Sequence, residues 1–395
     1  MPHSPTARIA RIARIRRTTG ARLAFATAAV VAAAVAAAEG TAPAPAEAQG
    51  GVQTVPAARA PTRPGPPPPA AQVIFDTDMG NDIDDALALA MLHALESRGE
   101  VRLLAVTVTK DEPYAAPYVD LLNTFYGRPD VPVGVVRGGV TPHPDYPRVV
   151  ATMTDAAGVL VYPHDLRSGS AAPEATALLR QVLAAQPDSS VVIVQVGFST
   201  NLARLLATPG DRHSPLDGRA LVARKVRRLA VMAGFFGRGR PGGRDFVEYN
   251  VERDVASART LFAEWPGAID VSGFEVGETI LYPAVSIARD FRYAARHPVR
   301  DAYLAYTGGR WPYDRPTWDL TSVLQAVRPD RGYFTLSAPG RVVLDARGRT
   351  TFHPDRAGRH RYLRASPAQA AQAREAMIQL ASQPPERPPE RVPTP

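Results

Sequence analysis

Short apolar runs alternate with helical patterns along most of the chain. The apolar runs predict β-strands at residues 73–76, 101–108, 131–136, 191–196, 228–233 and 268–272. The helical patterns lie at residues 84–97, 115–126, 174–186, 201–207 and 254–264, and the segment 285–327 is mainly helical as well. Continuous apolar strands that alternate with helices are typical of a parallel sheet buried on both faces. We therefore predict an α/β fold with a mainly parallel, Rossmann-like open sheet that has helices on both faces.

The two ends of the chain differ in composition from this pattern. Residues 1–22 carry six arginines and no acid, and residues 23–38 form an apolar run rich in Ala and Val, which is typical of a secretory signal. An uncleaved membrane anchor is the alternative for this segment. No other segment is apolar for long enough to span a bilayer. We expect an exported protein, periplasmic or extracellular, with no stable membrane insertion after the signal is cleaved.

Proline and alanine mark the boundaries of the folded part. Residues 40–71 and the last dozen residues are rich in Pro, and such segments remain extended rather than packing into a core. The expected organisation is a signal peptide over residues 1–48, a linker over residues 49–71, a folded domain over residues 72–380 and a disordered Pro-rich tail over residues 381–395.

Charge and cysteine content exclude several functions. The formal net charge is +8, but the first 70 residues hold eight arginines against two glutamates and contribute +6 of it. The rest of the chain is therefore nearly neutral, and we expect no nucleic-acid partner. The absence of cysteine excludes a disulfide, a thiolate nucleophile and a zinc–thiolate site.

Five aspartates stand where the first predicted strand ends and the first predicted helix begins. They are Asp76, Asp78, Asp82, Asp84 and Asp85. Carboxylates this close cannot all remain ionised unless a positive charge lies among them, and helix capping explains one or two of them at most. With no His or Cys nearby, the group favours Ca²⁺ or Mg²⁺, which prefer oxygen ligands. An EF-hand is excluded, because Asn81 or Ile83 would occupy the position that requires Gly.

Four blocks in the same order resemble the nucleoside hydrolase family, whose members include inosine-uridine preferring enzymes. The first is DTDMGNDIDDALAL, which contains the five aspartates. The others are VVIVQVGFSTNLARLL at residues 191–206, RLAVMAGFF and DFVEYNVERDVASARTLF within residues 228–262, and PTWDLTSVL at residues 316–324. The resemblance covers about residues 72–330. It implies a catalytic domain that hydrolyses the N-glycosidic bond of a ribonucleoside to free base and ribose.

The resemblance also implies roles for individual residues. It implies Ca²⁺ held by Asp78, Asp84, Asp85, Asp319 and the backbone carbonyl of Thr200. Asp78 is expected to serve also as the general base that accepts a proton from the attacking water. Asp84 is expected to reach the ribose, and Glu248 and Asn250 to hold its hydroxyls. The expected partner is a small-molecule nucleoside, and the resemblance suggests a homodimer or homotetramer.

The chain departs from the family pattern at several positions. Many members have His-Asp where this chain has Trp318-Asp319, so the imidazole often assigned to protonating the departing base is missing. Trp318 either stacks on the base or fills the core. Lys110 replaces a family Asn, and it contacts either the substrate or the aspartates in a structural ion pair. His164 is a weak candidate acid. Asp82 lies in a two-residue insertion, and a solvated loop carboxylate is its simplest interpretation.

Two other functions remain open from the sequence. A strand followed by Asp-x-Asp also opens the haloacid-dehalogenase-type phosphatases, in which the first Asp attacks phosphorus. The segment FDTDMGN lacks the Thr or Val expected two residues after the second Asp, and that motif has no need of Asp84 and Asp85. The other alternative is a non-catalytic, Ca²⁺-dependent nucleoside- or sugar-binding protein of the same fold, for which the missing His is the argument.

Overall fold

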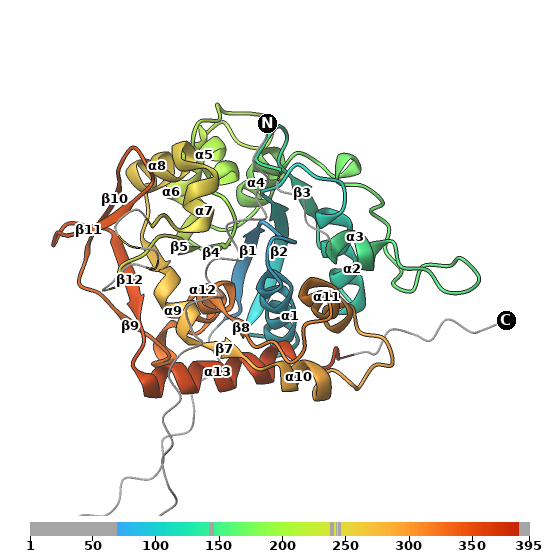
Figure 1. The fold of residues 1–395 in the computed structure, drawn as a ribbon. Helices are drawn as coiled ribbons and strands as arrows, with labels where there is room; N and C mark the ends of the chain where they lie inside the picture. Colours follow the sequence, from blue (N-terminus) through green and yellow to red (C-terminus); the bar gives the residue numbers. More distant parts are fainter. Residues whose placement is uncertain (1–68, 142–145, 238–240, 242, 244–245, 387–395) are drawn as a thin grey trace, which may run out of the picture. The chain divides into compact units, whose positions relative to one another are not determined.

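A sheet of ten strands runs through the described part of the chain (Figure 1). The computed structural model describes residues 69–141, 146–237, 241, 243 and 246–386. The expected signal peptide over residues 1–48 lies outside these residues. So do nearly all of the expected linker and residues 387–395 of the expected tail. None of the helices described here has both the length and the apolar character needed to cross a membrane.

The main sheet combines long buried strands with shorter ones. Its strands are β1 (Ala71–Thr77), β2 (Val101–Val108), β3 (Val133–Val135), β4 (Val191–Gln195), β5 (Val226–Met232), β6 (Ile269–Ser272), β9 (Thr335–Leu336), β10 (Gly340–Leu344), β11 (Thr350–Pro354) and β12 (His360–Arg364). The strand order is β11-β10-β12-β6-β5-β4-β1-β2-β3, and β9 pairs with β12. A separate antiparallel pair is formed by β7 (Leu281–Tyr282) and β8 (Arg315–Pro316).

Helices connect the strands. They are α1 (Asp84–Ser97), α2 (Ala115–Phe125), α3 (Tyr146–Ala151), α4 (Ala175–Ala184), α5 (Thr200–Leu206), α6 (Gly218–Lys225), α7 (Tyr249–Arg253), α8 (Val255–Glu264), α9 (Phe274–Thr279), α10 (Ala284–Arg289), α11 (Pro298–Thr307), α12 (Trp318–Val327) and α13 (Pro367–Ala381), with 3₁₀ turns η3 (Gly169–Ala171) and η4 (Pro329–Arg331). Several of these helices have an N-terminus that is capped by a side chain. Asp217 caps α6, Asp254 caps α8, and Ser366 forms a capping box with Gln369 at α13.

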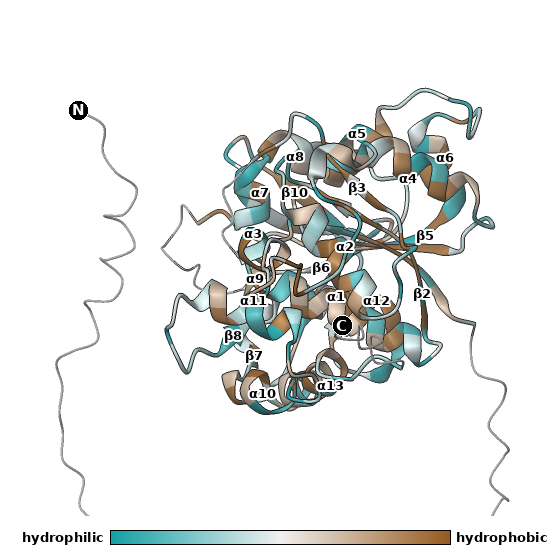
Figure 2. Cartoon of the chain, turned by 90° about the vertical axis from the view of Figure 1, so that its right-hand side faces the viewer, coloured by the Kyte–Doolittle hydropathy of each residue, from teal (hydrophilic) through white to brown (hydrophobic). Residues whose placement is uncertain are grey.

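Both faces of the central strands are buried. Along β1, Val73 and Phe75 point into one apolar cluster and Ile74 points into another, as the alternation of side chains along a strand requires. Helices α1, α11, α12 and α13 contribute to the first cluster, and α4, α5, α6 and α8 to the second. Figure 2 shows the strands as a hydrophobic band between helices. The predicted α/β fold with helices on both faces is confirmed.

The six predicted strands form the parallel half of the sheet, β6-β5-β4-β1-β2-β3. The sheet continues beyond the last predicted strand, because β12 pairs in parallel with β6, and β9, β10 and β11 add antiparallel pairs. The sequence analysis missed this extension. The burial of β10 alternates from residue to residue, as in a strand with one exposed face, so it lacks the continuous apolar run of a doubly covered strand.

The order of the strands creates a switch point beside β1. From β1 the chain moves outward to β2 and β3, and it then returns to place β4, β5 and β6 on the other side of β1. In open α/β sheets, ligands bind at the carboxyl ends of the strands where this reversal occurs. Asp78 follows β1 and Val196 follows β4, so both residues lie at this point.

Gly197, directly after β4, allows these two strand ends to approach each other. A Cβ atom built at Gly197 would collide with the backbone nitrogen of Asp78 and lie 2.5 Å from Thr109 Oγ1. Gly197→Ala is therefore expected to reduce the free energy of unfolding by about 3 kcal/mol, the upper part of the range for overpacking. Urea denaturation followed by circular dichroism measures this change.

Gly267→Ala is the matched control, because its nearest Cβ contact is an ordinary 3.4 Å from Trp265 Nε1. We expect this control to change the stability little. Equal stability of the two variants would show that the close approach at Gly197 does not constrain the strand ends.

Candidate active site and metal centre

A cavity of about 340 Å³ lies at the switch point. Its described lining consists of acidic side chains, aromatic rings, one cation and four further residues. The acids are Asp78, Asp82, Asp84, Asp85, Glu248 and Asp319, and the rings are Tyr249, Phe274, Tyr306 and Trp318. Arg315 is the cation of the lining, and Asn81, Val196, Met232 and Asn250 complete it. The sequence analysis predicted most of the acids, together with Asn250 and Trp318, but it did not predict Arg315.

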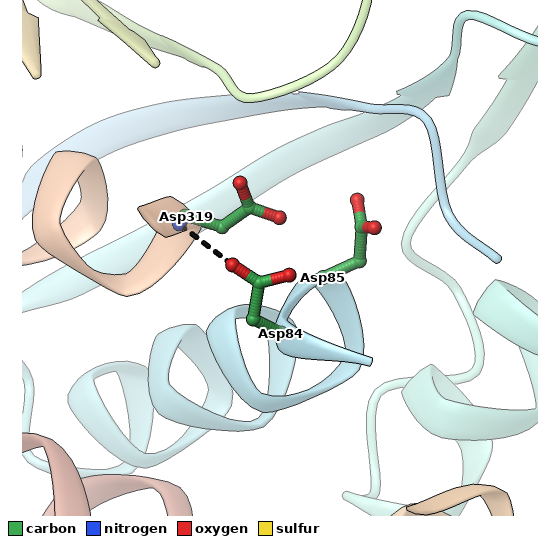
Figure 3. Close-up of side chains that lie close together, drawn as sticks. All are labelled: Asp84, Asp85 and Asp319. Carbon is green, nitrogen blue, oxygen red and sulfur yellow. Dashed lines mark hydrogen bonds between the residues drawn. The ribbon is translucent and has the colours of Figure 1, made fainter. Parts of the chain in front are cut away.

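Three carboxylates meet in this cavity from two helices (Figure 3). Asp84 and Asp85 stand in the first turn of α1, and Asp319 stands in the first turn of α12. Each offers an oxygen, and these oxygens all lie within 4.8 Å of one another. We call these three residues the carboxylate cluster. The backbone N–H of Asp319 donates to Asp84 Oδ2 at 3.0 Å and joins the two helix starts.

Helix capping does not explain the carboxylate cluster. The N-cap positions of α1 and α12 are Ile83 and Thr317, and neither makes a side-chain cap hydrogen bond. Burial raises the pKa of Asp84, Asp85 and Asp319 well above the ordinary value, and repulsion from neighbouring aspartates, Asp78 and Asp82 among them, raises each of them further. Buried oxygen donors that repel one another in a shared space fit a hard divalent cation, which would remove the repulsion.

Asp78 lies beside the carboxylate cluster at the end of β1. Burial raises its pKa to about 6, and the positive charge of Lys110 opposes this shift. The side chain of Asn81 donates to Asp78 Oδ2, and Asn81 Oδ1 in turn accepts from Lys110 Nζ at 3.1 Å. Lys110 also donates to the carbonyl of Met79 at 3.3 Å.

The sequence left two roles open for Lys110, contact with the substrate or contact with the aspartates. Its side chain is fully buried, and it is not among the residues that line the cavity. Its contacts are with the loop that carries Asp78. These contacts support the second of these roles, in which Lys110 braces the loop.

Two residues before Asp78, Asp76 faces the interior and ties the strand to its surroundings. Asp76 Oδ1 accepts from Thr107 Oγ1 at 2.6 Å and from Asn201 Nδ2 at 2.8 Å, so it connects β1 with β2 and α5. Thr77 points the other way, and its hydroxyl donates to Asp85 Oδ1. These bonds fix the end of β1 relative to the first turn of α1.

Glu248 and Asn250 line the cavity, but their hydrogen bonds are to the protein. Glu248 caps α7, where its carboxylate accepts from the backbone N–H groups of Asn250 at 2.8 Å and Gly234 at 3.1 Å. Burial raises the pKa of Glu248 to about 7. Asn250 Nδ2 donates to the carbonyls of Val196 at 2.8 Å and Met232 at 3.3 Å. The pair thus holds the ends of β4 and β5 against α7.

Two candidates from the sequence do not reach the cavity wall. Thr200 is buried at the start of α5, and its hydroxyl donates to Asp254 Oδ2 at 2.6 Å. The atom of Thr200 expected to bind the metal is its backbone carbonyl, so this bond of the hydroxyl leaves that expectation a prediction. His164 is buried elsewhere, with Nδ1 at 2.8 Å from the carbonyl of Tyr162. No histidine stands among the described residues that line the cavity.

Asp82 and Arg315, which both line the cavity, form an ion pair. Arg315 Nε donates to Asp82 Oδ1 at 2.8 Å, and its Nη2 donates to Oδ2. This corrects the expectation that Asp82 is a solvated loop carboxylate. The two residues are 233 positions apart, so no local pattern in the sequence reveals the pair.

The ring of Trp318 belongs to the cavity and not only to the core. Its Nε1 donates to the carbonyl of Phe274 at 2.9 Å, and the two rings stack with centroids 5.2 Å apart. The guanidinium carbon of Arg315 lies 5.1 Å from the Trp318 ring and 5.3 Å from the Tyr306 ring. Phe274, Tyr306 and Trp318 form the ring wall of the cavity.

The sequence model of one protein family, described as inosine-uridine preferring nucleoside hydrolase, matches residues 73–379. The chain belongs to the nucleoside hydrolase family. It is accordingly a hydrolase that acts on N-glycosyl compounds. A search of curated proteins gave no match.

Solved structures of nucleoside hydrolases share the fold of this one. An inosine-uridine preferring nucleoside hydrolase from Bacillus anthracis is 18% identical, with a TM-score of 0.58, and the match covers 79% of this chain and 99% of that chain. A plant nucleoside hydrolase is 21% identical, with a TM-score of 0.58 and coverage of 80% and 100%. A purine-preferring ribonucleoside hydrolase from Gardnerella vaginalis is 17% identical, with a TM-score of 0.56 and coverage of 79% and 99%.

The carboxylate cluster of this nucleoside hydrolase predicts a measurable effect of metal on stability. Asp319→Asn keeps the backbone N–H that bonds to Asp84 and removes one of the repelling charges. In chelator at neutral pH, we expect the variant to be more stable than the wild type by about 1 kcal/mol. Ca²⁺ at 100 times its dissociation constant should stabilise the wild type by about 2.7 kcal/mol and the variant by much less. Thermal unfolding with and without Ca²⁺ measures both effects.

Asp290→Asn serves as the control, because this aspartate is exposed on another surface of the protein. It should respond to Ca²⁺ as the wild type does. An undiminished Ca²⁺ response in Asp319→Asn would be evidence against a metal centre that includes this residue.

Proposed function

We propose that this nucleoside hydrolase cleaves the N-glycosidic bond of a ribonucleoside with Ca²⁺ held by Asp78, Asp84, Asp85 and Asp319. One observation carries the proposal: the segment after β1 and the first turns of α1 and α12 bring carboxylates into one cavity that also has a wall of rings. Acids suit a cation and the hydroxyls of a sugar, whereas rings suit a flat base. The cavity thus offers a separate surface for each half of a nucleoside.

In the proposed reaction, water attacks the sugar and displaces the base. When bound, Ca²⁺ supplies orientation and a lowered pKa for the attacking water. Asp78 accepts the proton of this water, whose oxygen forms a bond with the anomeric carbon. The bond between that carbon and the base nitrogen breaks, and its electron pair leaves with the base. The surrounding carboxylates stabilise the positive charge that develops on the ribosyl ring.

The ligand set supports the choice of Ca²⁺. The candidate ligands are carboxylates with no nitrogen or sulfur donor beside them, which favours a hard cation. Ca²⁺ accepts six to eight oxygens at flexible geometry, so it leaves room for two sugar hydroxyls and a water, whereas Mg²⁺ requires a near-ideal octahedron. By resemblance to the family, the backbone carbonyl of Thr200 is proposed as a further oxygen ligand. Glu248 and Asn250, which also line the cavity, are proposed to contact the sugar.

We also infer the setting of the enzyme from the sequence. The arginine-rich and apolar N-terminal segment supports export to the periplasm or the outside of the cell. Resemblance to the family supports a homodimer or homotetramer. The proposed partner is a free nucleoside, and no nucleic acid is involved.

The reaction can be tested by removing the proposed base and the proposed metal separately. Asp78→Asn is close in shape to the wild-type residue, but it cannot accept the proton, so kcat/KM for inosine and uridine should fall about 10³-fold or more. A chelator should abolish turnover by the wild type, and added Ca²⁺ should restore it. A reducing-sugar assay detects the released ribose, and chromatography detects the free base.

Asp290→Asn should retain full activity in the same assays, and circular dichroism should show that Asp78→Asn is folded. Tight nucleoside binding without release of base, even at high enzyme concentration, would indicate a binding protein instead. Release of phosphate from phosphate esters in place of ribose would indicate a phosphatase. Either outcome would reject the proposed reaction.

A further inference from the structure

One cation lies among the six acids in the described lining of the cavity, and it is the side chain of Arg315. The guanidinium is on the side of the ring wall, 5.1 Å from the Trp318 ring and 5.3 Å from the Tyr306 ring. In the proposed reaction, the sugar faces the carboxylate cluster and the base faces the rings. The guanidinium therefore lies beside the position that the base would occupy.

The guanidinium is held firmly but retains free donors. It donates to Asp82 through Nε and Nη2, and to the hydroxyl of Tyr313 through Nη1 at 2.9 Å. A guanidinium carries five N–H groups. Three have these partners, so two remain for a ligand in the cavity. Asp82 fixes the plane of the group through two parallel bonds, and less conformational freedom is lost when a ligand binds.

Breaking the N-glycosidic bond leaves an electron pair on the base nitrogen. An enzyme can protonate the base as it leaves, or it can stabilise the negative charge that develops there. The described cavity lining has no histidine that would serve as the acid. A guanidinium cannot replace it as an acid, because its pKa is too high for it to release a proton. It can donate charge-assisted hydrogen bonds to oxygen or nitrogen acceptors on the rim of the base.

We propose that Arg315 binds the nucleobase and stabilises the negative charge that develops on it as the N-glycosidic bond breaks. This inference rests on the proposed function and names the group that assists departure of the base. The electron pair of the broken bond stays on the base nitrogen, and Arg315 keeps its protons. The anionic base takes its proton from solvent after the bond has broken.

The electrostatics of the site support this role. Burial acts to lower the pKa of Arg315, but its hydrogen bonds with Asp82 and the charge of Asp82 outweigh burial and raise the pKa above its ordinary value. The side chain is therefore protonated throughout the pH range in which the protein is folded. Hydrogen bonds from a fixed donor to a developing anion in a cavity that excludes water are typically worth 10² to 10³ in rate.

The test compares substrates that differ in their need for assistance. Inosine and uridine have poor leaving groups, whereas 4-nitrophenyl β-D-ribofuranoside releases 4-nitrophenolate, which is stable without help. Arg315→Met should lower kcat/KM for inosine and uridine about 100-fold. For the nitrophenyl riboside, we expect a loss of less than about threefold. A residue with only a structural role would lower both activities by the same factor, and such a result would overturn the proposal.

Two further variants strengthen the comparison. Arg310→Met removes a neighbouring exposed arginine that lies over the Tyr313 ring at 5.2 Å and does not line the cavity, so both activities should be unchanged. In Arg315→Ala, guanidinium ion at millimolar concentration should restore part of the activity with inosine while leaving the nitrophenyl activity unaffected. No rescue together with equal losses would place Arg315 in the support of the fold.

Failure of the proposed function has a different signature. If wild-type enzyme with Ca²⁺ hydrolyses neither the nucleosides nor the nitrophenyl riboside, the hydrolase reaction itself is rejected, and this inference falls with it. If the wild type hydrolyses all three, the reaction stands. The pattern of losses in Arg315→Met, together with the rescue of Arg315→Ala, then decides whether Arg315 assists the departing base.

Discussion

Electrostatic repulsion among buried carboxylates is the constraint on which the site depends. Asp84, Asp85 and Asp319 share a space that is almost closed to water, and neighbouring groups supply only part of the compensation. The first turns of α1 and α12 present the positive ends of their helix dipoles, which favour negative charge. Thr77 donates to Asp85, and the backbone of Asp319 donates to Asp84. A bound cation would remove the repulsion that remains, so we expect stability and metal binding to be linked in this protein.

Burial of the hydrophobic core provides free energy that offsets the repulsion among these carboxylates. Every residue of α1 from Asp84 to Leu95 is buried, so the helix passes through the interior rather than along the surface. It packs against α12 and α13, which cover it. Burial of so many apolar side chains fixes the position of the helix start. The helix therefore cannot shift to bring Asp84 and Asp85 into water, where their repulsion would be relieved.

The sequence predicted those parts of the structure that have a local cause. Strands covered on both faces are continuous apolar runs, and all six were predicted, but β10 alternates between buried and exposed residues and was missed. The aspartates after β1 were evident because they are adjacent in sequence. Asp319 was identified only through the family resemblance. The hydrogen bonds of Lys110 to Met79 and Asn81, and that of Thr200 to Asp254, join residues far apart in the sequence, so no local pattern reveals them.

The loop after β1 contributes to both the acidic part and the ring wall of the cavity. At one end it carries Asp78 and leads into Asp85, and between them it carries Asp82, which holds Arg315 beside Trp318. The two-residue insertion in the aspartate motif therefore does more than lengthen the loop. It supplies the acid that anchors a cation at the ring wall, in a chain that has Trp318 where the family resemblance leads one to expect His. The unusual loop and the unusual ring wall are thus parts of one arrangement, because a buried arginine at this position requires a carboxylate partner to remain there.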